Sequence, residues 1–238
     1  QHPLKKEETD RESLGNELKK KVDPIILRRM KEDNLEGLPE KIIVKHDKEK
    51  MPEVQLNRYL EVIKNARSAP SESGDKKTHI FNTIRTLSDI SLHPDLPYLS
   101  DLGFAEKKDN EIIHSSSRFI TTFNLISEIK RKDEKVIVFL ISRKMQRVVK
   151  RLLDNKFKIE THIINGQVKG SERQHLIDAF QDTPWFNVII LSPEAAGVGL
   201  NITEANHVIH LSRTWNPAKE DQASDRIYRI GQKRDVFI

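Results

Sequence analysis

The stretch KVIVFLISRKMQRVVKRLLDNKFKIETHII, residues 135–164, decides the fold class. Two short runs rich in apolar and β-branched residues, 135–140 and 159–164, flank a basic amphipathic segment at 143–155. The short runs predict strands, and the segment between them, with apolar residues at helical intervals, predicts a helix. Near-continuous apolar strands that alternate with helices are typical of a parallel sheet covered on both faces. The stretch therefore predicts one strand–helix–strand unit of an α/β domain.

The same alternation continues to the end of the chain. Further helices are expected at 117–132, at 171–181 and from about Pro217 to Ile230, and further strands at 187–191, 207–211 and 235–238. We therefore expect an α/β fold in which helices cover both faces of a parallel sheet.

The residues before about 116 do not show this alternation of strands and helices. A strand is expected at 40–47, helices at 52–67 and 78–96, a loop at 69–77, and irregular polar chain at 97–113. The first 35 or so residues mix charges of both signs and have few apolar anchors apart from 24–30. We interpret them as a helical or partly flexible lead-in.

Length and composition narrow the function classes. A chain of 238 residues is long enough to bury a sizeable core, as one large domain or as a core domain with an insertion. The absence of cysteine excludes disulfides, thiolate zinc sites and a cysteine nucleophile, and agrees with an intracellular location. No apolar run approaches the length of a membrane span, and the polar first residues predict no signal peptide. The net charge of +5 permits nucleic-acid binding without proving it.

Four loops follow expected strands at the end of the sheet where open α/β folds bind ligands. These loops are 141–146, 165–174, 192–201 and 212–222. All four are rich in Gly, Ser, Asn, Arg and Lys, which suit contacts with anions. For any single loop an ordinary turn with N-capping residues is the simpler interpretation, but four such loops together favour an anion-binding edge.

Two other patterns point away from common sites. GVGLN at 197–201 lacks the third glycine of the dinucleotide fingerprint, so a nicotinamide site is not expected. His207 and His210 are three apart on an expected strand and would point to opposite faces, as core or edge histidines rather than metal ligands. No metal site is expected, and no nucleophile–base pair supports an unrelated α/β enzyme.

A polar stripe lies near the C-terminus, in EDQASDRIYRIGQ at 220–232. Gln222, Arg226 and Arg229 are spaced by four and three residues, which places them on one face of a helix. The stripe is either an ordinary solvated face or a cationic surface aimed at a polyanion. The sequence has no phosphate-binding G-x-x-x-x-G-K-[ST] loop. Arginines aimed at an anion that another surface holds fit an arginine finger, because a guanidinium stays charged and binds phosphate oxygens through a planar fork.

From about Pro24 to its end, the chain resembles the C-terminal RecA-like lobe of the Swi/Snf ATPases, which are superfamily-two DNA translocases. KVIVFLISRKM (135–145) resembles motif IV, LSPEAAGVGLNITEANHVIHL (191–211) resembles motif V, and RTWNPAKEDQASDRIYRIGQKR (213–234) includes motif VI. The register of Q-A-x-x-R-x-x-R-I-G-Q with W-N-P is highly specific, and its wording is closer to bacterial and archaeal members. The resemblance implies a RecA-like parallel sheet with a helical insertion and a helical N-terminal lead-in.

The resemblance also implies roles for single residues. Arg226 and Arg229 match the motif VI arginines that reach the ATP phosphates held by the first lobe, and Gln222 matches the glutamine of that motif. The segments that couple the ATP cleft to the DNA are matched by Gly197, Gly199, Trp215 and Asn216. The loops that face the DNA backbone are matched by Ser142, Lys144, Asn165, Gly166 and Arg173.

By the same resemblance, we expect a linker from the first lobe at 1–37, the first strand region at 38–50, a helical insertion at 51–112 and the RecA-like lobe at 113–238. ATP and Mg²⁺ would be bound mainly by the first lobe, which this sequence does not contain, so this chain alone is expected to be inactive. The expected partners are double-stranded DNA and the first lobe, with no membrane, inside a prokaryotic cell rather than in a nucleus. A regulatory or partner-docking module with a vestigial ATPase remains the alternative.

Overall fold

The computed structural model describes residues 39–45, 49–68, 76–98, 104, 107–196, 200–225, 227–229 and 231–238, together with 13–14, 16–17 and 21. The chain separates into two compact units, Gln1–Leu38 and Pro39–Ile238. In the first unit the few described residues are helical, and Lys21 pairs with Glu17 at 3.3 Å. Most of the expected lead-in lies outside the described residues. No described helix is both long enough and apolar enough to cross a membrane.

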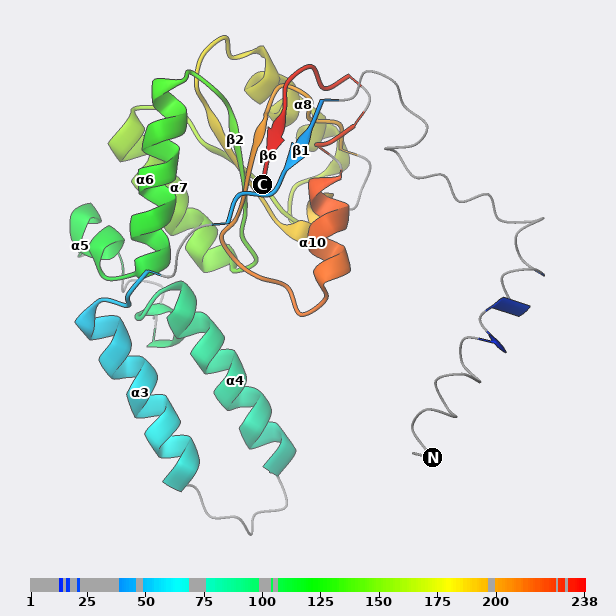
Figure 1. The fold of residues 1–238 in the computed structure, drawn as a ribbon. Coiled ribbons are helices and arrows are strands. Elements are labelled where there is room, and N and C mark those ends of the chain that lie inside the picture. Colours follow the sequence, from blue (N-terminus) through cyan, green and yellow to red (C-terminus); the bar gives the residue numbers. More distant parts are fainter. Residues whose placement is uncertain are drawn as a thin grey trace. The chain divides into compact units, whose positions relative to one another are not determined.

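The second unit is built on a parallel sheet of six strands (Figure 1). The strands run in the order β1-β6-β5-β2-β4-β3. Their bounds are β1 Lys41–Ile42, β2 Val136–Phe139, β3 His162–Ile164, β4 Val188–Leu191, β5 His207–His210 and β6 Val236–Phe237. The expected α/β class is confirmed. Of the strand expected at 40–47, only Lys41–Ile42 is a strand among the described residues, and its neighbour β6 is equally short.

Helices cover both faces of this sheet. α7 (Arg143–Phe157) links β2 to β3, and α8 (Gly170–Asp182) returns from β3 to β4, so a right-handed crossover places the two helices on opposite faces. The side chains of β2 alternate accordingly: Val136 and Val138 belong to the core cluster that contains the α7 residues, whereas Ile137 and Phe139 are buried outside that cluster.

The hydrophobic core cluster includes residues of α6 (Ser117–Arg131), α7 and the strands. Phe119 and Phe123 of α6 are almost completely buried, and the ring of Phe123 stacks on that of Phe157 with centroids 6.2 Å apart. Ser116 caps the start of α6, since its hydroxyl accepts a hydrogen bond from Phe119 N at 3.3 Å. The helix expected at 117–132 is confirmed to within one residue.

Two long helices, α3 (Glu53–Ser68) and α4 (Lys76–Leu92), form a hairpin beside the sheet (Figure 1). Gln55, which is completely buried, fastens the base of this hairpin to the sheet domain. Its Nε2 donates to Ile90 O at 2.8 Å, and its Oε1 accepts from Ser117 N at 3.0 Å. One glutamine therefore joins α3, α4 and the start of α6.

The connection from α4 to α6 is more regular than expected. α4 ends at Leu92, because the residue before Pro94 disfavours helical geometry. The 3₁₀-helix η1 (Leu96–Tyr98) and α5 (Asp109–His114) follow. The prediction of irregular chain over 97–113 was therefore wrong for α5, where Lys108 N donates to the Glu111 carboxylate at 3.2 Å and stabilises the first turn.

Candidate functional site

The loops at the carboxyl ends of the strands are fastened to one another. Gln146, which is buried on α7, donates to Leu140 O at the end of β2 (2.7 Å) and accepts from Asn165 Nδ2 after β3 (2.8 Å). Ile141 N donates to Ser212 Oγ, after β5, at 3.4 Å. Three of the four predicted loops, those after β2, β3 and β5, are thus joined, and Gln146 is a residue that the sequence pattern did not reveal.

The loop after β3 and the first turn of α8 carry three of the residues predicted to face DNA. Asn165 is nearly buried, and its Oδ1 accepts from Gln167 N at 3.0 Å, so its side chain holds the loop. Gly166 is exposed, and a Cβ added there would meet no atom within 4 Å. Arg173 donates from Nε to Val168 O at 2.9 Å, which orients its guanidinium. This structure therefore requires no glycine at 166 for its own packing.

A groove of ≈ 1010 Å³ lies between α4 and the loops that follow β2 and β5. It brings together four predicted residues from two loops, Ser142, Lys144, Trp215 and Asn216. The groove does not include Asn165, Gly166 or Arg173. Its cationic lining residues, which we call the groove cations, are Arg85, Arg118, Arg143, Lys144, Arg213 and Lys219. The carboxylates that line it are Asp89 and Glu194, so positive charge prevails.

A buried carboxylate fixes the loop that presents Trp215. Glu220 accepts hydrogen bonds from Arg213 Nε at 2.9 Å and from Thr214 N at 2.6 Å. Asn216 caps α10 (Pro217–Ser224) by accepting from Ala218 N at 3.1 Å. Trp215 is held between these two anchors with 79% of its surface exposed, which is unusual for a tryptophan. Glu220 has no counterpart among the sequence predictions.

The groove is electrostatically unfavourable for its own cations. Burial lowers the pKa of Arg118, and the nearby charge of Arg213 lowers it further. Burial also raises the pKa of Asp89, an effect that the charge of Arg85 partly opposes. A guanidinium keeps its proton at neutral pH despite such shifts. The groove therefore carries more positive than negative charge, which favours an anion.

The segment with the predicted arginine fingers departs from a single helix. α10 ends at Ser224, so the prediction of a helix from Pro217 to Ile230 was too long, and Arg229 lies beyond the helix end. Ser224 and Asp225 have low helix propensity, and the Ser224 hydroxyl bonds to His210 Nε2 at 2.8 Å. The proposed common helical face of Gln222 and Arg229 is therefore not formed.

Both of these residues are nevertheless on the surface. Gln222 is exposed and lines a small cavity of ≈ 100 Å³ with Glu194 and Lys219, and Arg229 is also exposed. Arg226, Gly197 and Gly199 lie outside the described residues. The roles predicted for all five residues stay predictions.

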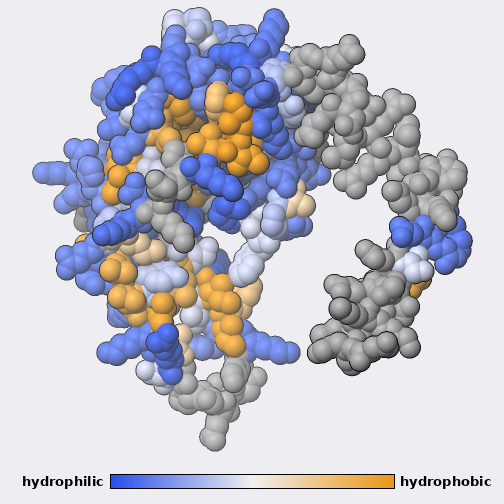
Figure 2. Space-filling model, viewed as in Figure 1, coloured by the Kyte–Doolittle hydropathy of each residue, from blue (hydrophilic) through white to orange (hydrophobic). Residues whose placement is uncertain are grey.

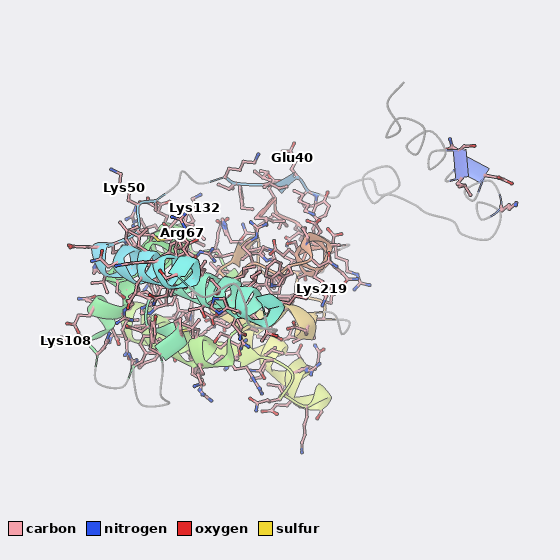
Figure 3. All side chains as sticks on the ribbon, turned by 90° about the horizontal axis from the view of Figure 1, so that it is seen from below. Glu40, Lys50, Arg67, Lys108, Lys132 and Lys219 are labelled. Carbon is pink, nitrogen blue, oxygen red and sulfur yellow. The ribbon has the colours of Figure 1, made fainter. Side chains whose placement is uncertain are left out.

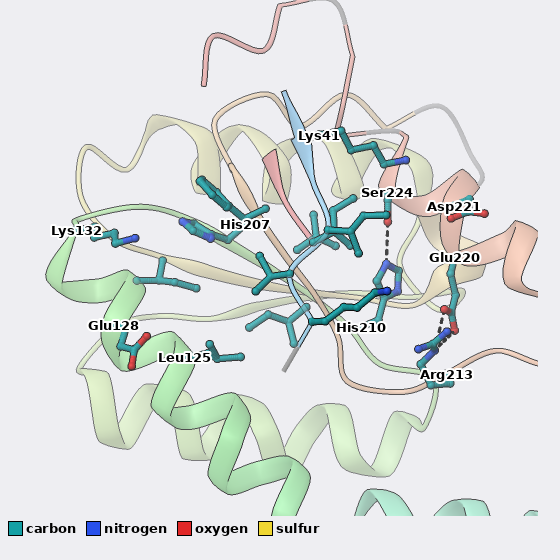
Figure 4. Close-up of a pocket in the computed structure, with 18 residues that line it drawn as sticks. Lys41, Leu125, Glu128, Lys132, His207, His210, Arg213, Glu220, Asp221 and Ser224 are labelled. Atoms are coloured by element: carbon teal, nitrogen blue, oxygen red, sulfur yellow. Dashed lines mark hydrogen bonds and ion pairs between the residues drawn. The ribbon is translucent and has the colours of Figure 1, made fainter. Parts of the chain in front are cut away.

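The two histidines of β5 make separate contacts, and their predicted placement on opposite faces of the sheet stays a prediction. His207 pairs with Glu134 at 2.6 Å, and His210 stacks on Phe139 with ring centroids 5.0 Å apart. They adjoin a second cavity, of ≈ 800 Å³, which contains none of the predicted site residues (Figure 4). Within the described parts of the chain, no group of three or more His, Asp or Glu residues is arranged to hold a metal ion.

Comparison with known proteins agrees with this architecture. Residues 119–231 match the helicase conserved C-terminal domain. The chain is 36% identical to the Zorya protein ZorD of Escherichia coli O139:H28, over 99% of this chain and 22% of that protein. It is 34% identical to the putative ATP-dependent helicase/translocase YwqA of Bacillus subtilis, over 99% of this chain and 25% of that protein.

A solved structure extends the comparison to three dimensions. The Sulfolobus solfataricus SWI2/SNF2 ATPase core in complex with double-stranded DNA is 31% identical and superposes with a TM-score of 0.66, over 93% of this chain and 45% of that one. The chain belongs to the SWI2/SNF2 ATPase family. Its sheet is the RecA-like sheet of the C-terminal lobe in that family. The chain spans about a quarter of the length of the two curated relatives.

Proposed function

We propose that the chain is the second motor lobe of an ATP-dependent double-stranded DNA translocase. The observation that carries the proposal is the cationic groove at the carboxyl edge of the sheet, between α4 and the loops after β2 and β5. Excess positive charge in such a groove suits the phosphate backbone of DNA. The DNA complex of the Sulfolobus relative and the helicase/translocase name of the Bacillus relative support the same substrate.

In this proposal, the chain acts on ATP that the first lobe holds. Arg226 and Arg229 would approach the phosphates when the lobes close, and their guanidinium groups would stabilise the charge that develops during phosphoryl transfer. Gln222 belongs to the same surface segment. Mg²⁺, which neutralises phosphate charge in such reactions, would be bound mainly by the first lobe, because the described residues offer no carboxylate cluster.

In this proposal, the loops at the carboxyl edge of the sheet bind the DNA. Ser142, Lys144, Asn165, Gly166 and Arg173 would contact backbone phosphates, while Trp215 and Asn216, with Gly197 and Gly199, would link the DNA to the ATP cleft. Contacts with phosphate position a protein on DNA without reading its sequence, so binding should be salt-sensitive and weakly sequence-specific. Substrates of this kind place the working protein inside the cell.

The decisive experiment measures DNA-stimulated ATP hydrolysis by the full-length protein and its Arg226→Ala and Arg229→Ala variants. We expect each variant to lose about 10³-fold in rate while DNA binding is retained, because an arginine finger contributes at least that much to phosphoryl transfer. Arg234→Ala is the matched control, since Arg234 bonds to Glu204 O in a neighbouring turn and should leave the rate unchanged.

Unchanged hydrolysis in both finger variants would contradict the arginine-finger assignment. A wild-type protein that binds DNA but whose hydrolysis is absent would instead support the regulatory module with a vestigial ATPase. The 238-residue chain alone is expected to hydrolyse almost no ATP, and substantial turnover by it would contradict the assignment of the phosphate and Mg²⁺ contacts to another lobe.

A further inference from the structure

The hairpin helix α4 forms one wall of the cationic groove, and the start of α6, which is bonded to the end of α4, contributes Arg118 to the lining. We propose that Arg118 at the start of α6 and Arg85 on α4 bind phosphates of the DNA backbone, so that the helical hairpin is part of the DNA-binding surface. The inference rests on the proposed function. It adds two residues to the proposed DNA contacts, and both lie on helices outside the loops at the sheet edge and outside the family motifs.

Arg118 occupies a position that folding alone does not favour. It is the second residue of a helix of 15 residues, where the positive end of the helix dipole repels a cation. Its guanidinium is partly buried, and Arg213 lies close enough to lower its pKa. Among the described residues, no carboxylate lies within 4.0 Å of it to form an ion pair. Burial, the helix dipole and the neighbouring charge all disfavour this cation.

The position nevertheless orients the side chain of Arg118 toward the groove. Arg118 Nη1 donates to Leu211 O, at the end of β5, at 3.3 Å. That hydrogen bond uses one of the five N–H donors of the guanidinium and leaves the group at the lining of the groove. A phosphate placed there would remove the electrostatic penalty and bind through the planar fork. An uncompensated, oriented arginine in a groove is the arrangement that an anion completes.

The other groove cations extend the positive surface across the groove. Arg213 is paired with Glu220 at 2.9 Å, which fixes its place beside Arg118. Arg85 is exposed on α4, one helical turn before Asp89. Lys219, on α10, also lines the groove, and its side chain is labelled in Figure 3. Positive charge thus comes from the hairpin, from α6 and from the loops, which matches a ligand with several phosphates rather than one small anion.

The test is equilibrium binding of a labelled DNA duplex by the full-length protein over a range of salt concentrations. Arg118→Gln and Arg85→Gln should each reduce the slope of log K against log salt by about 0.9, the value for one lost phosphate contact. The loss of affinity should be the same for duplexes of different sequence. Arg118→Lys keeps the charge and should keep the slope, although it loses the fork.

Two matched controls come from the same elements. Arg131→Gln changes an exposed arginine at the other end of α6, and Arg67→Gln changes one on the other helix of the hairpin. Both should bind DNA with the wild-type slope. Arg85 is exposed, so Arg85→Gln should not disturb folding, and thermal unfolding of Arg118→Gln separates lost contacts from lost structure.

Wild-type affinity and slope in both Arg118→Gln and Arg85→Gln would overturn the inference. If the Arg226→Ala and Arg229→Ala variants still lost DNA-stimulated hydrolysis, the proposed function would stand and only the role of the hairpin wall would fail. A wild-type protein that binds no duplex would overturn both proposals.

Discussion

The sheet domain and the α3/α4 hairpin are held in place by different forces. Leu152 of α7 is completely buried in the core cluster, whereas Leu60 of α3 is 52% exposed. Figure 2 shows apolar side chains at the surface of both hairpin helices. Val54 and Phe81 are among the exposed ones. The helices of the sheet domain are fixed by apolar burial along their length, whereas in the hairpin the buried apolar residues, such as Ile90 and Leu92, lie at its base.

At its base the hairpin is held by the buried Ile90 and Leu92 of α4 and by polar contacts. His93 is completely buried, and its Nε2 lies 3.1 Å from Ile112 O and 2.9 Å from Ser115 Oγ. Asp95 binds Arg58 of α3 and, at 2.6 Å, Lys107. Gln55 adds its bonds to α4 and α6. Because α4 is one wall of the groove, these hydrogen bonds and ion pairs set the position of that wall relative to the strand ends.

The largest loss of stability is expected from a substitution in the core of the sheet domain. Leu152→Ala removes a fully buried side chain and leaves a cavity beside the sheet, which should lower the free energy of unfolding by about 2–5 kcal/mol. Urea unfolding followed by circular dichroism would measure it. A loss below about 1 kcal/mol would mean that the core rearranges readily and would weaken the contrast with the hairpin.

The second largest effect is expected from acid pH, which should destabilise the base of the hairpin through His93. Burial lowers the pKa of His93 to about 4, against the opposing influence of Ile112 O and Asp95, while Lys107 and Arg58 reinforce the shift. The folded state therefore holds this imidazole neutral at pH values where the unfolded chain protonates it. The stabilisation is complete above pH 6.5 and is lost progressively as the pH falls from about 6.5 to 4. A shift of this size corresponds to a loss on the order of 3 kcal/mol.

Amide hydrogen exchange of α4, followed over this pH range, would locate the effect. His207 and His210, whose pKa values burial also lowers, add a trend of the same sign in the sheet domain. The comparison therefore uses His93→Gln, which should remove the acid-dependent part of the exchange in α4. Identical pH profiles for the wild type and this variant would contradict a role for the imidazole in holding the hairpin.

The sequence predicted the periodic parts of the fold well. The α6 and α7 helices and the β2 and β4 strands lie within a residue or two of their expected places, because burial on one or both faces leaves a repeating apolar pattern. α10 was overestimated, since the intervals of Gln222, Arg226 and Arg229 continue a helical repeat past Ser224, where the described backbone is no longer helical. Residues that share one face of a helix are spaced by three or four positions, but the same spacing also occurs in chain that is not helical.

The sequence allowed us to single out site residues that belong to one local motif. It did not reveal residues whose contacts join segments that are distant in the sequence. Ser142, Lys144, Trp215 and Asn216 were singled out from local motifs, and the structure places them in one groove. Gln146, Glu220 and Arg118 act through contacts that depend on the fold, such as the bond from Arg118 to Leu211 O across 93 positions of sequence. Local periodicity contains no information about such pairs.

The smallest effect is expected from the exposed face of the hairpin. Leu60→Ala shortens a side chain that already contacts water, and alanine favours a helix at least as much as leucine does, so the free energy of unfolding should change by less than about 0.5 kcal/mol. The measurement is the same urea titration used for Leu152→Ala, which makes the two leucines a matched pair. A loss as large as that of Leu152→Ala would show that another surface covers Leu60 in solution, and the hairpin would then be fixed by apolar burial like the sheet domain.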